Sequence, residues 1–208
     1  MPQLLRCFSA QDYPQELIEW IIVDASEVPV EIEHPSVHYF RAEKQGPQSI
    51  GVMRNQTIAH ATGDVMVNMD DDDYYFTSWV SYAARSVWPT GLAGVIWRYN
   101  LDVKDGTVYK SGPYRKWLSP AGMTAFTREY SEQYRYGENG MGRRSDEEIK
   151  FTRGYHNPLT ALDQAQSGVG IVHGTNSCNT IKRPASEMTM EDLIDDEPSR
   201  DFYRSFRS

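Results

Sequence analysis

The feature that most constrains this chain is a short apolar run that leads into four consecutive acidic residues. Residues 65–67 (VMV) have the composition of a strand buried on both faces inside a parallel sheet. Residues 70–73 (DDDD) then place four carboxylates at the carboxyl end of that strand, where open α/β sheets bind ligands. Such carboxylates repel one another unless a cation lies among them. The run therefore predicts a divalent metal site for a phosphate-bearing ligand, and the alternative is a solvated acidic turn.

Composition and charge exclude several classes of protein. The chain of 208 residues suits one domain, and its 39% of hydrophobic residues suffice for a core. No apolar run approaches the roughly 18 residues of a transmembrane helix, and the first residues lack the apolar region of a signal peptide. Two cysteines are too few for a disulfide framework, so we expect a cytoplasmic protein. A net charge of −8 argues against a nucleic-acid surface.

The apolar periodicity predicts an α/β fold, with a mostly parallel sheet flanked by helices and extended by antiparallel additions. In the first half we expect helices over residues 2–8, 49–62 and 77–88, the last capped by Thr77, and strands over 17–23, 37–40 and 65–69. In the second half we expect strands over residues 94–103, 107–110, 121–126 and 168–173, a hairpin turn at 105–106, and a helix over 146–153. The acidic stretch after residue 182 predicts peripheral helices or a linker.

Two residues near a strand end are candidates for ligand binding. Asp24 closes the predicted strand at residues 17–23, and Ser26 follows it. A carboxylate at this edge can accept hydrogen bonds from a base or a ribose. The alternative is that Asp24 caps a turn.

Arg54 is a candidate because of its position on a predicted helix. It shares the expected sheet-facing side of that helix with three apolar residues, Ile50, Ile58 and Ala61. An arginine on that side needs an anionic partner. A diphosphate or the acids at residues 70–73 would serve, and the alternative is a structural ion pair.

Titratable residues in the second half add a possible base and a possible metal ligand. Asp146, Glu147 and Glu148 lie at a probable helix start, where acids favour the helix dipole or where one of them could act as a general base. His173 ends the last predicted strand, and a neutral imidazole there can ligate a metal. A lone histidine is more often structural.

Several segments together resemble GT-A glycosyltransferases of the inverting family-2 type. The donor-binding half is similar in residues 49–55 (SIGVMRN), 61–64 (ATGD) and 70–75 (DDDDYY). Four further segments resemble other elements of the family, namely residues 21–26 (IIVDAS), 121–124 (AGMT), 146–151 (DEEIKF) and 173–176 (HGTN). The match covers about residues 3–180. Relative to the family, the sequence begins at the helix that follows the loop walling the nucleotide base, so the first strand is missing or this chain is a trimmed or reannotated version.

The resemblance implies a domain organisation. We expect a GT-A domain over residues 1–182, with a donor-binding half at about 1–90 and an acceptor half at about 91–182. A helical arm or linker over residues 183–208 follows, and further domains of a longer polypeptide could adjoin it.

The resemblance also implies an activity. It is the metal-dependent transfer of a hexose from a nucleotide-diphosphate sugar, with a UDP-sugar favoured, to a hydroxyl of a glycan or glycoprotein. We expect inversion of the anomeric carbon, and retention is the alternative. The implied roles are donor binding by Asp24, Ser26, Arg54, Asp70 and Asp71, and Mn²⁺ or Mg²⁺ binding by Asp72 and His173. For the general base, the resemblance favours Glu148, with Glu147 as the second candidate and Asp146 as the third.

Two alternatives to this activity remain at the level of the sequence. One is a non-catalytic module that binds a nucleotide sugar or Ca²⁺. The other is a sugar-phosphate nucleotidyltransferase, although the early glycine-rich, lysine-bearing loop of those enzymes is not found.

Overall fold

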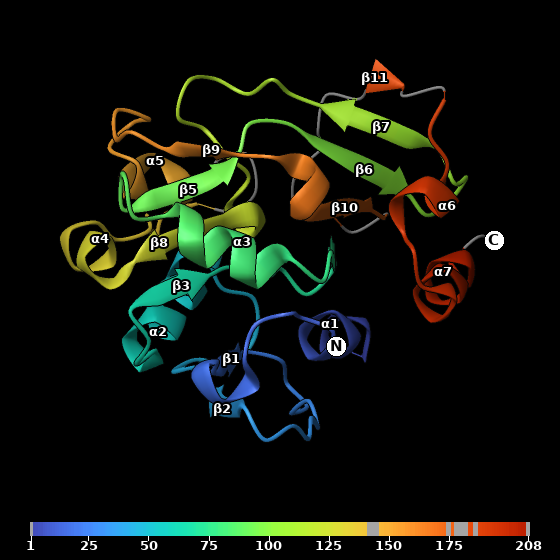
Figure 1. Cartoon of the computed structure of the whole chain (residues 1–208). Coiled ribbons are helices and arrows are strands. Elements are labelled where there is room, and N and C mark those ends of the chain that lie inside the picture. The colour runs from blue at the N-terminus through green and yellow to red at the C-terminus, as the bar shows by residue number, and fades with distance from the viewer. Residues whose placement is uncertain (1, 141–145, 174–175, 177–182, 185–186, 207–208) are drawn as a thin grey trace.

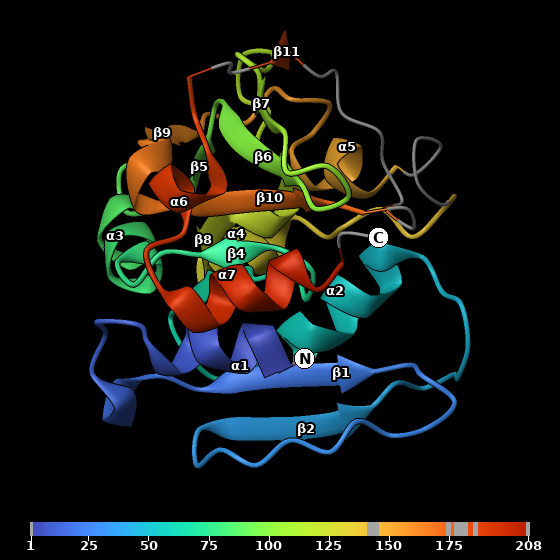
Figure 2. The same cartoon turned by 90° about the vertical axis from the view of Figure 1, so that its right-hand side faces the viewer.

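The strands lie in three sheets (Figures 1 and 2) in a computed structural model that describes residues 2–140, 146–173, 176, 183–184 and 187–206. The smallest sheet pairs β1 (Trp20–Asp24) with β2 (Val37–Arg41). A four-stranded sheet has the order β3 (Val65–Val67), β8 (Thr124–Thr127), β5 (Leu92–Val95), β9 (Thr160–Leu162). A five-stranded sheet has the order β11 (Arg183–Pro184), β7 (Val108–Ser111), β6 (Arg98–Asp102), β10 (Gly168–Val172), β4 (Tyr74–Tyr75).

The mixed α/β class is confirmed, but parallel pairing is rarer than predicted. Among the described strands, three of the eight pairings are parallel, namely β1 with β2, β6 with β10 and β5 with β9. Parallel neighbours need a long crossover connection. The predicted turn at residues 105–106 instead joins β6 and β7 as an antiparallel hairpin, and β8 runs antiparallel to both of its neighbours.

The helices pack around these sheets. They are α1 (Pro2–Ser9), α2 (Ile50–His60), α3 (Trp79–Ser86), α4 (Arg128–Gln133), α5 (Glu147–Phe151), α6 (Met190–Leu193) and α7 (Glu197–Arg204). The predicted start of α2 is confirmed, because the Ser49 hydroxyl accepts a hydrogen bond from Val52 N at 3.3 Å. The predicted cap at Thr77 is wrong, since Ser78 precedes α3 and makes no side-chain capping bond.

Two predicted strands differ from the observed ones for clear reasons. The predicted strand 94–103 is two strands, because the chain leaves the four-stranded sheet after β5 and enters the five-stranded sheet at β6. The run at residues 65–67 is half-buried rather than buried on both faces. In the described part of the chain β3 pairs with β8 alone, so it is an edge strand of its sheet.

The end of the chain packs against its beginning (Figure 2). Gln3 Nε2 in α1 donates a hydrogen bond to Ser199 Oγ in α7 at 2.6 Å. The hydroxyl of Tyr74 in β4 lies 2.8 Å from Asp195 and 2.9 Å from Asp196. The predicted helices after residue 182 are therefore present, whereas the domain limits remain predictions. Within the described ranges, the helices are too short or too polar to cross a membrane.

Candidate active site

Three of the four consecutive aspartates converge in the loop between β3 and β4. Asp70, Asp72 and Asp73 each bring one carboxylate oxygen within 4.8 Å of the others. We call these three residues the acid cluster. Asp71 lies beside it, and the pKa of Asp71 is raised by desolvation and by the negative charges of Asp72 and Asp70. The sequence thus predicted the convergence of carboxylates at the end of β3.

Each carboxylate of the acid cluster is held by a different element. Asp70 Oδ1 lies 2.6 Å from Arg54 Nη2 in α2. Asp72 Oδ2 lies 2.9 Å from Nε2 of His173, which directly follows β10. Asp73 is the most buried of the three at 5% exposure, and its Oδ2 lies 3.0 Å from Arg98 Nη1 in β6. Side chains from both halves of the chain therefore meet at this loop.

Asp73 is tied to the five-stranded sheet. Its Oδ1 accepts a hydrogen bond from the backbone N–H of Ile171 in β10 at 2.8 Å. Burial raises the pKa of Asp73, while the Arg98 guanidinium opposes that rise. Because Asp73 has two protein donors on its two oxygens, its carboxylate anchors the loop to β6 and β10. Arg98 was not among the predicted site residues, although a charged residue inside a strand is a signal for a buried anionic partner.

His173 and Asn176 fix Asp72 from the other side of the site. Asn176 Nδ2 lies 3.4 Å from Asp72 Oδ2 and donates to the Ile171 carbonyl at 3.0 Å. The Asp72 side chain keeps 38% exposure. Asp72 is thus oriented by the protein and still open to a ligand. It lies next to His173, the other residue that was predicted to bind the metal.

Arg54 bridges the acid cluster and the acids of α5. Its Nη2 binds Asp70, and its Nε binds Glu147 Oε1 at 2.6 Å. The guanidinium is 13% exposed and lies 5.7 Å from the centre of the Tyr136 ring. Desolvation alone would lower the pKa of Arg54, but the charges of Asp70, Tyr136 and Glu147 keep it well above the usual value. The expected anionic partners are therefore protein carboxylates.

The helix face predicted for Arg54 is only partly correct. Ile58 is buried at 7% exposure, whereas Ile50 at the first turn is 39% exposed. The side of α2 that carries Arg54 is directed to α5 as well as to the sheet, since Arg54 binds Glu147. A contact of Arg54 with a diphosphate remains a prediction.

The three consecutive acids of residues 146–148 have three different environments. Asp146 binds Lys150 at 3.0 Å and accepts hydrogen bonds from Asn139, and Lys150 and Asn139 lower its pKa. Glu147 is 8% exposed and pairs with Arg54. Glu148 Oε1 accepts a hydrogen bond from the backbone N–H of Ala121 at 3.0 Å. Because neighbouring helical residues point in different directions, these acids have separate roles.

Glu148 is the acid whose proton affinity is raised most clearly. Burial raises its pKa to about 7, and the negative charge of Glu147 adds to the rise. The backbone N–H of Ala121 and the charge of Arg54 act in the opposite direction. A carboxylate with a pKa near neutrality has the proton affinity that suits a general base.

Residues 121–122 connect Glu148 to the acid cluster. Ala121 donates to Glu148, and a Cβ atom at Gly122 would overlap the Asp70 carboxylate, so a larger residue there would displace that carboxylate. The hydroxyl of Tyr75 accepts from Asp70 N at 2.6 Å and donates to Gly122 O at 2.9 Å. Tyr75 was not among the predicted site residues. The short segment before β8 thus brings the acids of α5 next to those after β3.

Asp24 and Ser26 lie in a turn after β1. Asp24 accepts hydrogen bonds from Ser26 N at 2.7 Å and Tyr39 OH at 2.5 Å, and it binds Arg41 at 2.7 Å. Burial would raise the pKa of Asp24, but the hydrogen bonds from Ser26, Tyr39 and Val30 N hold it well below its usual value. None of these contacts reaches the acid cluster. Asp24 caps a turn here, and base or ribose binding by Asp24 and Ser26 remains a prediction.

Comparison with known proteins agrees with this geometry. Residues 2–149 match the family described as Glycosyl transferase family 2. The chain belongs to glycosyl transferase family 2. A search of the curated proteins finds no match for it.

Solved structures share the fold of this family-2 chain. S. aureus TarS 1-349 has a TM-score of 0.59 and 13% identity, and the match covers 82% of this chain and 56% of TarS 1-349. TarS 1-349 in complex with UDP-GlcNAc has a TM-score of 0.57 and 14% identity, and the match covers 83% of this chain and 55% of that one. A third similar structure is the mannosyltransferase PcManGT from Pyrobaculum calidifontis in complex with GDP-Man and Mn²⁺. It has a TM-score of 0.55 and 16% identity, and the match covers 83% of this chain and 53% of PcManGT. The predicted GT-A fold is confirmed, and the chain spans little more than half the length of each.

The Asp73→Asn variant of this family-2 chain is expected to lose stability rather than its ligand site. Removal of one partner from a buried ion pair costs roughly 3–5 kcal/mol, and Arg98 would be left unpaired beside β10. The matched variant Asp72→Asn, with a more exposed carboxylate, should unfold near the wild-type denaturant concentration. Urea unfolding of the three proteins measures the difference. Equal midpoints for both variants would contradict the anchoring role of Asp73.

Proposed function

We propose that the chain moves a sugar from a nucleotide-diphosphate sugar to an acceptor hydroxyl, with the help of a divalent metal ion. The observation that carries this proposal is the bridge through Arg54, which joins the acid cluster to Glu147 and thereby sets Glu148 beside it. Donor-binding and base chemistry would then share one site. Family membership supports the proposal, as do the UDP-GlcNAc and the GDP-Man with Mn²⁺ in the similar structures.

The residues present fit a divalent ion. The oxygen ligands of the acid cluster lie within 4.8 Å of one another, and carboxylate oxygens are the ligands that Mg²⁺ and Mn²⁺ prefer. Asp72 and His173 would hold the ion, since Asp73 is engaged with Arg98 and Ile171 N. When bound, the ion would offset the negative charge that develops on the leaving diphosphate.

Residues around the acid cluster would bind the donor. Asp70 or Asp71 would accept hydrogen bonds from the ribose hydroxyls, and Arg54 would add positive charge near the diphosphate. Asp24 and Ser26 would contact the base or ribose from the turn after β1. A UDP-sugar is the favoured donor.

Glu148 would act on the acceptor. Its carboxylate takes the proton of the acceptor hydroxyl as that oxygen forms a bond to the anomeric carbon and the bond from that carbon to the diphosphate oxygen breaks. Attack from the side opposite the leaving group inverts the anomeric centre. Glu147 holds Arg54, and Asp146 binds Lys150, so Glu148 is preferred over both as the base. The acceptor is a glycan or glycoprotein hydroxyl, and the cytoplasmic location belongs to the same proposal.

The test is turnover of a nucleotide sugar. UDP-GlcNAc, UDP-glucose and GDP-mannose are incubated with the protein and Mn²⁺, and released nucleotide and free sugar are quantified by NMR. We expect slow hydrolysis of one donor that stops in EDTA. The alternative of a non-catalytic module predicts binding without release of sugar from any donor, and that outcome would overturn the proposal.

Arg54→Ala is expected to weaken both stability and donor binding. The variant removes the ion pair between Arg54 and Glu147, whose side chains are 13% and 11% exposed, and the loss of one partner of a buried pair costs about 3–5 kcal/mol. The control Arg204→Ala removes surface ion pairs, which contribute little, and should leave the stability close to that of the wild type. Thermal unfolding and nucleotide titration measure the two effects. Normal nucleotide affinity per folded molecule would limit Arg54 to a structural role.

A further inference from the structure

A cavity lies at the end of the four-stranded sheet opposite the acid cluster. It has a volume of about 340 Å³ and is lined by residues just before β5, just before β9 and just after β8. Val65 pairs with Thr127 in antiparallel register, so Thr127 lies at the amino end of β3, whereas the acid cluster follows the carboxyl end. Pockets of about 300–1,000 Å³ accommodate small ligands. This cavity is therefore separate from the proposed transfer site.

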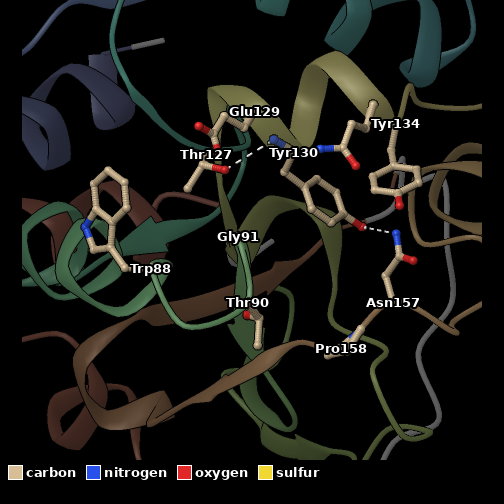
Figure 3. A pocket seen from close by; sticks show the side chains of 10 residues that line it. Trp88, Thr90, Gly91, Thr127, Glu129, Tyr130, Tyr134, Asn157 and Pro158 are labelled. Atoms are coloured by element: carbon tan, nitrogen blue, oxygen red, sulfur yellow. Dashed lines mark hydrogen bonds between the residues drawn. The ribbon is translucent and has the colours of Figure 1, made fainter.

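Three aromatic side chains stand among the polar residues of the cavity wall (Figure 3). The ring of Tyr130 lies between Trp88 on one side and Tyr134 on the other. Trp88 is 63% exposed, which leaves a large apolar surface open to solvent. Tyr130 is held in place, because its hydroxyl donates to Phe151 O at 2.9 Å and accepts from Asn157 Nδ2 at 2.8 Å. The wall thus combines a fixed ring with an exposed one.

The polar side chains among the aromatic rings include amides and a carboxylate. Asn157 is 7% exposed, and within the described residues no donor is bonded to its carbonyl oxygen. Gln133 and Glu129 are exposed at the rim. Among the ten described lining residues there is no lysine or arginine. The cavity therefore offers hydrogen bonds to hydroxyl groups and no cation for a phosphate.

We propose that this cavity is a second binding site, for a neutral saccharide. An oligosaccharide can stack the apolar C–H face of one ring on Trp88, while hydroxyl groups of its other rings donate to Asn157 Oδ1 and to Gln133 Oε1. A nucleotide or sugar phosphate is excluded by the lack of basic lining groups. A protein partner is less well matched, because hydrogen-bonding groups are interspersed with the aromatic rings. The site does not depend on the proposed transfer activity.

The test uses neutral trisaccharides on the ¹⁵N-labelled chain, without nucleotide and in EDTA. Chitotriose, maltotriose and mannotriose are titrated into the millimolar range while the tryptophan indole N–H signals are followed. The Trp88 signal is assigned by its loss in Trp88→Tyr. We expect one trisaccharide to shift this signal saturably, in the wild type and equally in Asp72→Asn, which separates this result from any failure at the acid cluster.

Variants of Trp88 then measure the stacking contact. Trp88→Ala should weaken saccharide affinity about tenfold, as expected when one aromatic contact is lost. Trp88→Tyr should restore most of it, and Phe206→Ala, which removes another exposed aromatic ring, should leave it unchanged. Affinities are read from saturation-transfer signals of the sugar. The proposal is overturned if no trisaccharide shifts the Trp88 signal, if Trp88→Ala binds as well as the wild type, or if sedimentation shows Trp88-dependent self-association instead.

Discussion

Glu148→Gln is expected to reduce sugar transfer by about 10² to 10⁴-fold, the usual contribution of a general base. Glutamine keeps the size of the side chain and can accept the hydrogen bond from Ala121 N, but it cannot take a proton at neutral pH. Nucleotide affinity should stay close to that of the wild type. Initial rates and nucleotide titrations on the same preparations measure both quantities.

The pH dependence of the reaction gives an independent check on Glu148. The base acts in its ionised form, and burial raises its pKa to about 7. The value of kcat/KM should therefore rise with pH through about 7 and level off above it. This rise should be absent in Glu148→Gln. Asp146→Asn, at a carboxylate that binds Lys150 on the surface, should keep both the rate and the profile within a few-fold. If the Glu148→Gln variant also stays within a few-fold, the base lies elsewhere.

Asp72→Asn is expected to lose at least about tenfold in metal-dependent nucleotide affinity. Loss of even an outer partner of a metal ligand costs about 10–100-fold in metal affinity, and Asp72 is the carboxylate best placed to bind the ion itself. Asp201→Asn, an equally conservative change at an exposed carboxylate of α7, should have no effect. Calorimetric titration of nucleotide in the presence of Mn²⁺ measures the loss. Wild-type affinity in Asp72→Asn would remove this residue from the metal site.

The fold was predictable where local signals were strong. Ser49 caps α2 as expected, and residues 105–106 turn the hairpin between β6 and β7. Local patterns do not record which sheet a strand joins. The break at residues 96–97 therefore went unseen, because residues 94–103 were predicted as one strand but β5 and β6 pair in different sheets. The half-burial of β3 was missed for the same reason, since edge position is a tertiary property.

The candidate site was predictable in its residues and less so in its contacts. The acids at 70–73, Arg54 and His173 do meet around one loop. Their ion pairs join residues far apart in the sequence, such as Arg54 with Glu147, and no short-range pattern encodes such pairs. Asp24 was predicted to bind a ligand because it ends a strand, as the acids after β3 do. Its carboxylate oxygens already accept hydrogen bonds from Ser26 N and Tyr39 OH.

Calorimetric titration of UDP and GDP into the wild-type chain, with Mn²⁺ and with EDTA, tests the central claim most directly. We expect Mn²⁺ to tighten the binding of at least one of the two nucleotides, because the ion would link the diphosphate to Asp72 and its neighbours in the acid cluster. Equal affinity with Mn²⁺ and with EDTA for both nucleotides would contradict it.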